Sequence, residues 1–189
     1  SKKKSKIHLI QNKALELSLF LTLPASAALL IASEEIISAL FGYGSFDQES
    51  AINSGKALYY FALGLPAFSL IKVFSSFFFA NHDTKIPFYI SLFSVLMNIV
   101  ISISYFGEIG FIIIPIATTI SSWLNAILLF AFLKNRDLFS FNNIFLVRFV
   151  KIIIASLLMA IFFNFLITYF KYELAFNQNI KSFYLILSV

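Results

Sequence analysis

One lysine stands inside an otherwise apolar run, and its ammonium group is the side chain best suited to binding an anion there. Lys72 lies in LGLPAFSLIKVFSSFFFA, residues 63–80. At 100° per residue, Ser69, Ser75 and Ser76 fall within about 60° of Lys72 on a helix. Two interpretations stay open: the lysine stem snorkels towards the lipid headgroups, or this polar stripe faces a protein interior or a watery cavity. Under the second interpretation, Lys72 and these serines line a substrate path, or Lys72 forms a structural ion pair or hydrogen bond.

Two later apolar runs carry similar polar stripes, each with one asparagine. Asn98 shares a face with Ser91, Ser94 and Ser102, and Asn125 lies near a second set. Stripes of small polar residues let membrane helices pack closely and hydrogen-bond to one another. Such contacts between helices account for the serines and threonines, whereas Asn98 and Asn125 are also candidates for a cavity wall. The second set consists of Thr118, Ser121 and Ser122.

Two prolines, Pro24 and Pro66, also lie inside apolar runs. Each lacks the N–H that an interior helix position donates, so each is predicted to kink its helix. Bent or broken helices are common where membrane transporters flex. A static kink explains either proline equally well.

The residues needed for catalysis or metal binding do not come together in this sequence. There is no cysteine, and His8 and His82 lie far apart. The sequence contains no HExxH, GxSxG, P-loop or glycine-rich dinucleotide motif. We therefore expect no metal site, no cofactor and no enzyme activity. Nucleic acid is not an expected partner, because the aromatic residues lie inside the apolar runs rather than among the basic ones.

The composition indicates a membrane protein, in which these polar residues are positioned by long helices. The chain of 189 residues is 60% hydrophobic and 12% charged, with a mean hydropathy of +0.90. Soluble domains contain about 25% charged residues. Five transmembrane helices are predicted, and a sixth begins near Ser182 and is cut short. The predicted spans are Leu17–Ser33, Ala57–Ala80, Ile86–Phe106, Phe111–Leu133 and Val150–Phe170.

The basic residues predict the orientation of these helices. With the loops numbered alternately, ten basic residues fall on one side and three on the other, Lys56, Lys171 and Lys181. Positively charged loops stay in the cytoplasm, so the first side is predicted to be cytoplasmic. A rival interpretation of the start, KKKSK followed by LFLTLP and the ASA triplet, is a cleaved signal peptide. The ten basic residues on the predicted cytoplasmic side are Lys2, Lys3, Lys4, Lys6, Lys13, Lys85, Lys134, Arg136, Arg148 and Lys151.

The sequence resembles the lipid II flippase family MurJ, also called MviN, over nearly its whole length. The resemblance is carried by LTLPASAALLIASEEIISALFGYGSFD, ALYYFALGLPAFSLIKVFSSFFFANHDTKIP and SSWLNAILLF in this order. The family belongs to the larger group of multidrug, oligosaccharidyl-lipid and polysaccharide exporters. The chain begins with Ser1 rather than Met and ends within an apolar run, SFYLILSV. We therefore expect it to be the C-terminal portion of a longer, two-lobed transporter.

The resemblance implies a polytopic helix bundle in the bacterial cytoplasmic membrane that moves an undecaprenyl-pyrophosphate-linked precursor outward by alternating access. It implies membrane potential or ions as the driving force, and no cofactor. Lys72 matches the lysine of the family's GLPAFxLxKV pattern, whereas the family's cavity arginines lie in helices that have no counterpart here. Residues 1–133 would belong to the second lobe, and residues 134–189 to a final helix pair that shapes a groove for the lipid tail.

Other functions remain as alternatives. The chain could export another lipid-linked oligosaccharide, or exchange drugs for cations as other transporters of the same group do. An antiporter needs an acid buried in a span, and Glu16 comes nearest to one. A membrane enzyme needs a cluster of His, Asp or Glu at a membrane face, which the loops do not supply. A membrane scaffold without transport activity is the remaining alternative.

Overall fold

Long apolar runs without strand-like alternation fold into helices, because a helix satisfies every interior backbone group within its own segment. The structure is a computed structural model that describes residues 2–41 and 48–176 of the chain, with side chains over 6–41 and 49–170. The described regular structure is all helical. It comprises α1 (Lys2–Phe41), α2 (Gln48–Phe79), α3 (Lys85–Ile109), the 3₁₀ turn η1 (Gly110–Ile112), α4 (Ile113–Asn135) and α5 (Asn143–Phe176).

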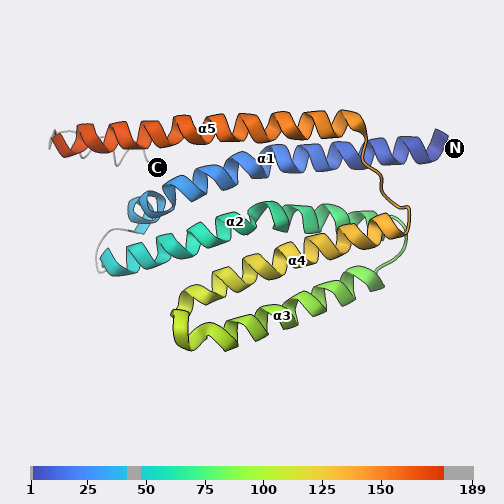
Figure 1. Ribbon diagram of the computed structural model, residues 1–189, viewed down its shortest axis with the longest axis horizontal. Helices are drawn as coiled ribbons and strands as arrows, with labels where there is room; N and C mark the ends of the chain where they lie inside the picture. Colours follow the sequence, from blue (N-terminus) through green and yellow to red (C-terminus); the bar gives the residue numbers. More distant parts are fainter. Residues whose placement is uncertain (1, 42–47, 177–189) are drawn as a thin grey trace.

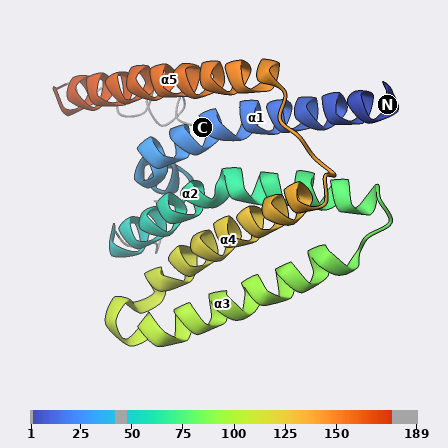
Figure 2. The same ribbon diagram turned by 45° about the vertical axis from the view of Figure 1, so that its right-hand side comes forward.

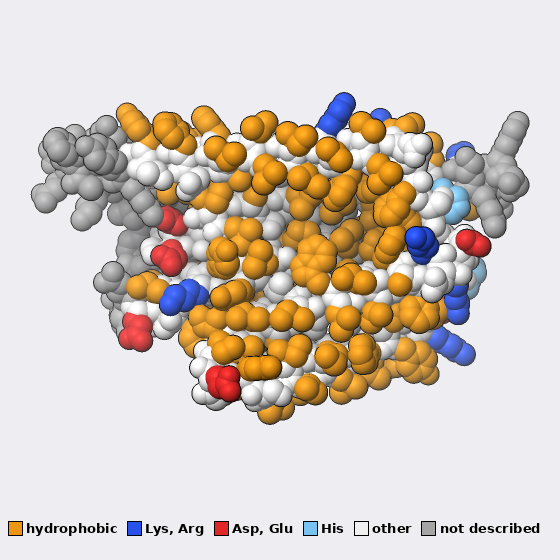
Figure 3. Space-filling view, viewed as in Figure 1, with side chains coloured by type: hydrophobic (Ala, Val, Ile, Leu, Met, Phe, Trp, Pro, Cys, Tyr) orange, Lys and Arg blue, Asp and Glu red, His pale blue; other side chains and the backbone are white. Residues whose placement is uncertain are grey.

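The helices lie side by side in the order α5, α1, α2, α4, α3 (Figures 1 and 2). Each runs antiparallel to the helix that follows it in the sequence, so the N-terminus of α1, the α2–α3 turn and the α4–α5 linker share one end of the bundle. We call this the basic end, because Lys6, Lys13, Lys85, Lys134 and Arg136 lie there. Figure 3 shows most Lys and Arg side chains near this end and most acidic ones near the other.

Polar side chains at the basic end start two of the helices. Asn142 Oδ1 accepts from the Ile144 N–H at 3.1 Å and so caps α5. Asp83 Oδ1 accepts from the Lys85 and Ile86 N–H groups at 3.2 and 3.3 Å, so α3 begins directly after a short turn. Pro87 lies in the first turn of α3, where no backbone donor is needed.

The helices extend well beyond the predicted spans, and part of one predicted loop is helical. The sequence predicts a loop from Phe41 to Lys56, but α2 already begins at Gln48. The FGEIG stretch, residues 106–110, predicts a tight reversal, and the structure places it slightly later, where α3 ends and Gly110, the first residue of η1, adopts a φ of +73°. Hydropathy marks where a chain enters lipid, whereas helix hydrogen bonds continue into the polar flanks. The predicted sixth span at Ser182 lies outside the described residues.

Within the described residues, four helical stretches are long and apolar enough to cross a membrane, rather than the predicted five. One of the four, Lys85–Asn135, contains both α3 and α4, which are joined through η1 and lie antiparallel (Figure 1). The other three are Lys6–Phe41, Glu49–Phe79 and Asn143–Phe170.

Large apolar side chains cover the outside of the bundle as well as its core (Figure 3). Leu157, Leu158 and Ile161 of α5 are 58%, 63% and 67% exposed. The buried core lies towards the basic end, where α1, α2 and α4 meet the α4–α5 linker around Leu15, Phe78 and Phe139. A surface this apolar is suited to lipid rather than to water.

Two amides of α1 hold the α4–α5 linker in place. Gln11 Nε2 donates to the Leu138 carbonyl at 3.1 Å. Asn12, which is 4% exposed, donates to the Ser140 carbonyl at 2.8 Å and accepts from the Asn142 N–H at 3.2 Å. The linker that starts α5 is therefore fastened to the start of α1.

Replacing Asn12 with alanine should loosen this linker. The change leaves a carbonyl and an N–H without partners, which costs about 1–3 kcal/mol per buried group. We expect faster tryptic cleavage after Arg136 and a lower melting temperature in the full-length protein. Asn143→Ala is the matched control, because Asn143 is exposed at the first position of α5. Equal cleavage rates in the two variants would contradict this prediction.

Candidate functional site

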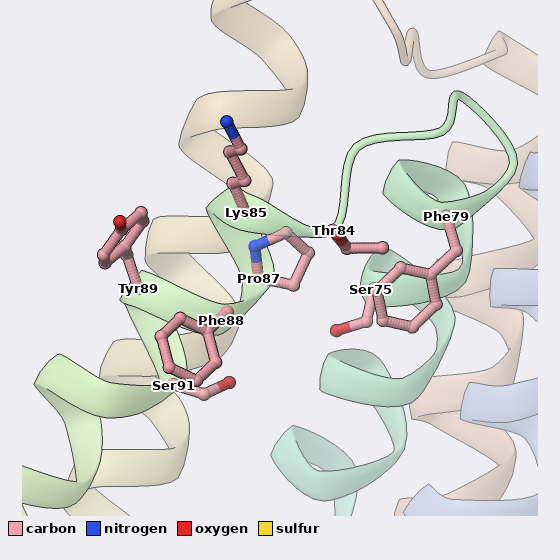
Figure 4. A pocket seen from close by; sticks show the side chains of 8 residues that line it. All are labelled: Ser75, Phe79, Thr84, Lys85, Pro87, Phe88, Tyr89 and Ser91. Atoms are coloured by element: carbon pink, nitrogen blue, oxygen red, sulfur yellow. The ribbon is translucent and has the colours of Figure 1, made fainter.

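A cavity of about 640 Å³ lies between the end of α2 and the beginning of α3, at the basic end (Figure 4). The Ser75 and Ser91 hydroxyls face the space between the two helices, whereas Lys85 and Tyr89 point outward at the rim. We call this space the α2–α3 cavity. Its lining comprises Ser75, Phe79, Thr84, Lys85, Pro87, Phe88, Tyr89 and Ser91.

The α2–α3 turn determines which residues meet in this cavity. The Asn81 and Asp83 N–H groups donate to the Phe78 carbonyl at 2.9 and 3.1 Å, which ends α2 abruptly. Because α3 begins at Lys85, Ser75 and Ser91 lie about the same number of residues from the turn and therefore at a similar depth. Asp83 also pairs with Arg136 at 2.6 Å, which ties the turn to the end of α4.

The lining supplies hydrogen-bond donors and positive charge. It contains four hydroxyl groups and one ammonium, and no acidic side chain of the described residues lies among them. Asn125 Nδ2 approaches Ser91 Oγ at 3.4 Å, so the Ser91 hydroxyl can donate its own proton to another acceptor. Phe79 and Phe88 add apolar walls. This arrangement is suited to an anionic or oxygen-rich group attached to an apolar one.

Lys72 lies on the exposed side of α2, close to the cavity but not in its lining. Its side chain makes no hydrogen bond or ion pair with the described part of the chain. Ser69, on one flank, hydrogen-bonds to Ser18 of α1, and Ser75, on the other, lines the α2–α3 cavity. The ammonium therefore projects between the α1 side and the α3 side of α2, away from the buried face that carries Phe74 and Phe78.

The structure separates the polar residues that the sequence grouped together. Ser69 joins α1 to α2, and Ser76 Oγ donates to the Val73 carbonyl of its own helix at 2.7 Å. Asn98 donates to Thr118 Oγ1 and Ser121 Oγ of α4 at 3.0 and 3.3 Å. Of the predicted substrate-path residues, only Ser75 lines the α2–α3 cavity. Asn125 contacts Ser91, which is one of the lining residues.

Asn125 is 7% exposed, and its Oδ1 atom is buried without a hydrogen-bond partner in the described residues. Its amide nitrogen contacts Ser91 on α3. The residue therefore connects α4 to the wall of the cavity while keeping one acceptor unused, which is costly in a buried site.

Pro66 lies inside α2, and the carbonyl that it leaves free has a partner on another helix. Pro66 has no N–H for the Ala62 carbonyl, and Ser26 Oγ of α1 donates to that carbonyl at 2.6 Å. Two further carbonyls of this stretch receive side-chain donors from α4: Thr119 Oγ1 to Tyr60 at 2.7 Å and Trp123 Nε1 to Leu63 at 3.0 Å. Pro24 lies inside α1, whose one non-helical residue falls further on, at Ala32.

Several residues at the basic end were not predicted from the sequence. Thr84, Lys85 and Tyr89 line the cavity, although the sequence predicted only a turn at the first two positions and a transmembrane helix at the third. The signal available in the sequence was their position, because Thr84 and Lys85 lie at the short turn and Tyr89 lies one helical turn beyond it. The ion pair of Arg148 with Glu16, at 2.9 Å, joins α5 to α1. It joins residues far apart in the sequence, so nothing local indicated it.

Comparison with known proteins places the chain in a family. The family model described as "Lipid II flippase MurJ" matches residues 1–184. A protein of Rhizobium meliloti (strain 1021) named "Probable lipid II flippase MurJ" is 41% identical over 151 residues, which are 80% of this chain and 28% of that protein. A protein of the same name from Thermotoga maritima is 37% identical over 142 residues, which are 75% and 28% of the two chains.

A solved structure has the same fold. It is titled "Lipid II flippase MurJ, inward closed conformation", and it matches 95% of this chain and 41% of its own, with a TM-score of 0.72 and 24% identity. The chain thus spans less than half the length of the proteins it matches. Its apolar helices and these matches identify it as a multi-pass membrane protein, and the chain belongs to the lipid II flippase MurJ family.

Proposed function

We propose that this chain is part of a flippase that moves lipid II across the bacterial cytoplasmic membrane. The observation that carries the proposal is the α2–α3 cavity, which has hydroxyl donors, Lys85 at its rim and no described acidic residue in its lining. A pyrophosphate head group cannot enter hydrocarbon unaided, because burying an unpaired charge costs several kcal/mol or more. Donors and cations within the protein remove much of that cost.

The basic end would lie in the cytoplasm, since basic residues accumulate on that side of bacterial membranes. The α2–α3 cavity would then form part of the cytoplasmic mouth of the substrate path, with Lys72 about 10.5 Å from the end of its helix at 1.5 Å per residue. Ser69, Ser76 and Asn98 would act by holding helices together rather than by contacting substrate. The protein would transport lipid II without changing it chemically.

We further propose that the chain supplies five membrane crossings, with α3 and α4 counted separately, and the beginning of a sixth. Residues 1–133 would belong to the second lobe of the transporter and residues 134–189 to a C-terminal helix pair. An antiporter is less well supported, because Glu16, the acid nearest a span, is paired with Arg148. Three backbone carbonyls in the helix segment before Pro66 accept hydrogen bonds from side chains of other helices, which suits a helix that bends during transport.

Replacing Lys72 with glutamine in the full-length protein tests this assignment. We expect lipid II transport to fall about fivefold to tenfold, because one favourable charge contact of about 1–1.4 kcal/mol is lost. Transport is measured as the rate at which lipid II reaches the outer leaflet of cells depleted of their own flippase.

Lys56→Gln is the control, since Lys56 is an exposed lysine near the opposite end of the same helix. Normal transport by the Lys72 variant at normal protein levels would remove this residue from the mechanism. Normal transport by both the Lys72 variant and a variant with a blocked α2–α3 cavity would remove the proposed path.

A further inference from the structure

A second groove, of about 390 Å³, lies between α1 and α5 on another part of the bundle. Phe20 and Pro24 of α1 form one wall. The wall from α5 consists of Lys151, Ile152, Ala155, Ser156 and Met159. None of these residues lines the α2–α3 cavity. We call this space the α1–α5 groove.

The α1–α5 groove begins at the boundary between the charged and the apolar parts of both helices. Lys151 is the last charged residue of α5 before an uncharged run to Phe170, and Glu16 is the last of α1 before an uncharged run to Ser33. The Arg148–Glu16 ion pair, at 2.9 Å, holds these two boundaries at the same level. From Lys151 to Met159 the groove therefore extends about 12 Å into the apolar part of the bundle, at 1.5 Å per residue.

Deeper than Lys151, none of the side chains that line the α1–α5 groove offers a free polar group. Ser156 is 7% exposed, and its hydroxyl donates to the Ile152 carbonyl at 2.8 Å. The other side chains there are apolar. This part of the groove is suited to a hydrocarbon chain and not to a sugar or a phosphate.

Positive charge accumulates at the mouth of the groove. Lys151 is exposed and forms no ion pair with the described residues. Arg148 lies on the same stripe of α5 as Ala155 and Met159, and Lys13 lies on the same stripe of α1 as Phe20 and Pro24, by helical periodicity. Against these three cations stands one acid, Glu16, which is already paired with Arg148. The mouth therefore has a net positive charge directly at the edge of an apolar groove.

We propose that the α1–α5 groove binds an anionic glycerophospholipid of the membrane leaflet at the basic end. Its phosphate lies beside Lys151 and Lys13, and one acyl chain runs between Phe20 and Ala155 towards Met159. Charge complementarity favours an anionic over a zwitterionic head group, because a lysine near the membrane surface attracts anionic lipid. The bound lipid fills the space between α5 and α1 and stabilises their packing.

Native mass spectrometry of the full-length protein in detergent tests this proposal, with dioleoylphosphatidylglycerol and dioleoylphosphatidylcholine as competing probes. We expect preferential retention of phosphatidylglycerol. Lys151→Gln should lower that retention about fivefold, which is the effect of losing one lysine at a lipid surface. Ala155→Trp should lower it as well, because the indole fills the groove without changing the charge.

Two variants are matched controls. Lys134→Gln removes an exposed lysine at the same end of the bundle, and Leu158→Trp adds an indole to an exposed position of α5 outside the groove. Both should retain phosphatidylglycerol as the unmodified protein does. Because the readout is lipid retention, the result is independent of whether the protein transports lipid II.

Three outcomes would overturn the proposal. Equal retention of the two phospholipids would show that the head group is not recognised. Unchanged retention in both Lys151→Gln and Ala155→Trp would place the bound lipid elsewhere, or show that a segment of the protein itself occupies the groove. Retention of undecaprenyl phosphate, added as a third probe, in place of phosphatidylglycerol would identify the groove as a substrate site.

Discussion

Replacing Ser75 with tryptophan should abolish most lipid II transport, with a loss of about tenfold or more. Ser75 faces the α2–α3 cavity from α2, and its hydroxyl points towards the side of Ser91 (Figure 4). A space of about 640 Å³ that is open to the surface can accept an indole without displacing the core. The protein should therefore fold while the proposed path is blocked, and even a rise of about 1.4 kcal/mol in the barrier slows transport tenfold.

The measurement is rescue of growth and of outward lipid II transport in cells depleted of their own flippase, at matched protein levels. Ser104→Trp is the control, because Ser104 is an exposed serine of α3 that does not line the cavity. Ser75→Ala separates blockage from lost hydrogen bonding, and its effect should be smaller. Full rescue by Ser75→Trp would exclude this cavity from the path of the substrate.

Replacing Gly55 with leucine should loosen the packing of α1 against α2 and should lower the stability of the folded protein by about 1–3 kcal/mol. A Cβ atom at Gly55 would lie 2.8 Å from Glu34 Cγ and 3.0 Å from Glu34 Cα. The second neighbour is backbone, so α1 itself would have to move. Overpacking of this kind costs about 1–3 kcal/mol, a large share of a stability of about 5–15 kcal/mol.

Gly107→Leu provides the matched control, because a Cβ atom there has no neighbour within 4 Å. Both glycines lie in helices, so both substitutions change helix propensity in the same direction. The measurement is the folded fraction by size-exclusion chromatography and the melting temperature of each full-length variant. Equal yields and melting temperatures for the two variants would show that the α1–α2 contact at Gly55 does not limit packing.

Most of the fold follows from sequence patterns that act locally. Apolar runs of about 20 residues must become helices in lipid. The turn after α2 follows from NHDTKIP, in which Asp83 accepts hydrogen bonds from the first two N–H groups of α3 and Pro87 occupies its first turn. The helix ends were less predictable. α2 begins at Gln48 and α5 at Asn143, because intrahelical hydrogen bonds continue past the point where hydropathy falls.

The candidate site was only partly predictable, because a helical stripe does not specify its partner. Ser69 and Ser75 flank Lys72 on the same helix, yet one contacts α1 and the other lines the α2–α3 cavity. Asn98 and Asn125 lie on predicted polar faces, and the structure determines that Asn98 contacts α4 and that Asn125 contacts Ser91.

By itself, therefore, the sequence determined that the chain is helical, that it is suited to a membrane, which end is basic and which family it resembles. The first three properties depend on composition, periodicity and turns of a few residues, whereas the family resemblance depends on three specific stretches of sequence. Only the tertiary structure decided that Ser75 and Ser91 line the same cavity, with Lys85 at its rim, and that Arg148 pairs with Glu16 and joins α5 to α1. Such contacts join residues far apart in the chain, and they depend on which helices pack together, so no local pattern specifies them.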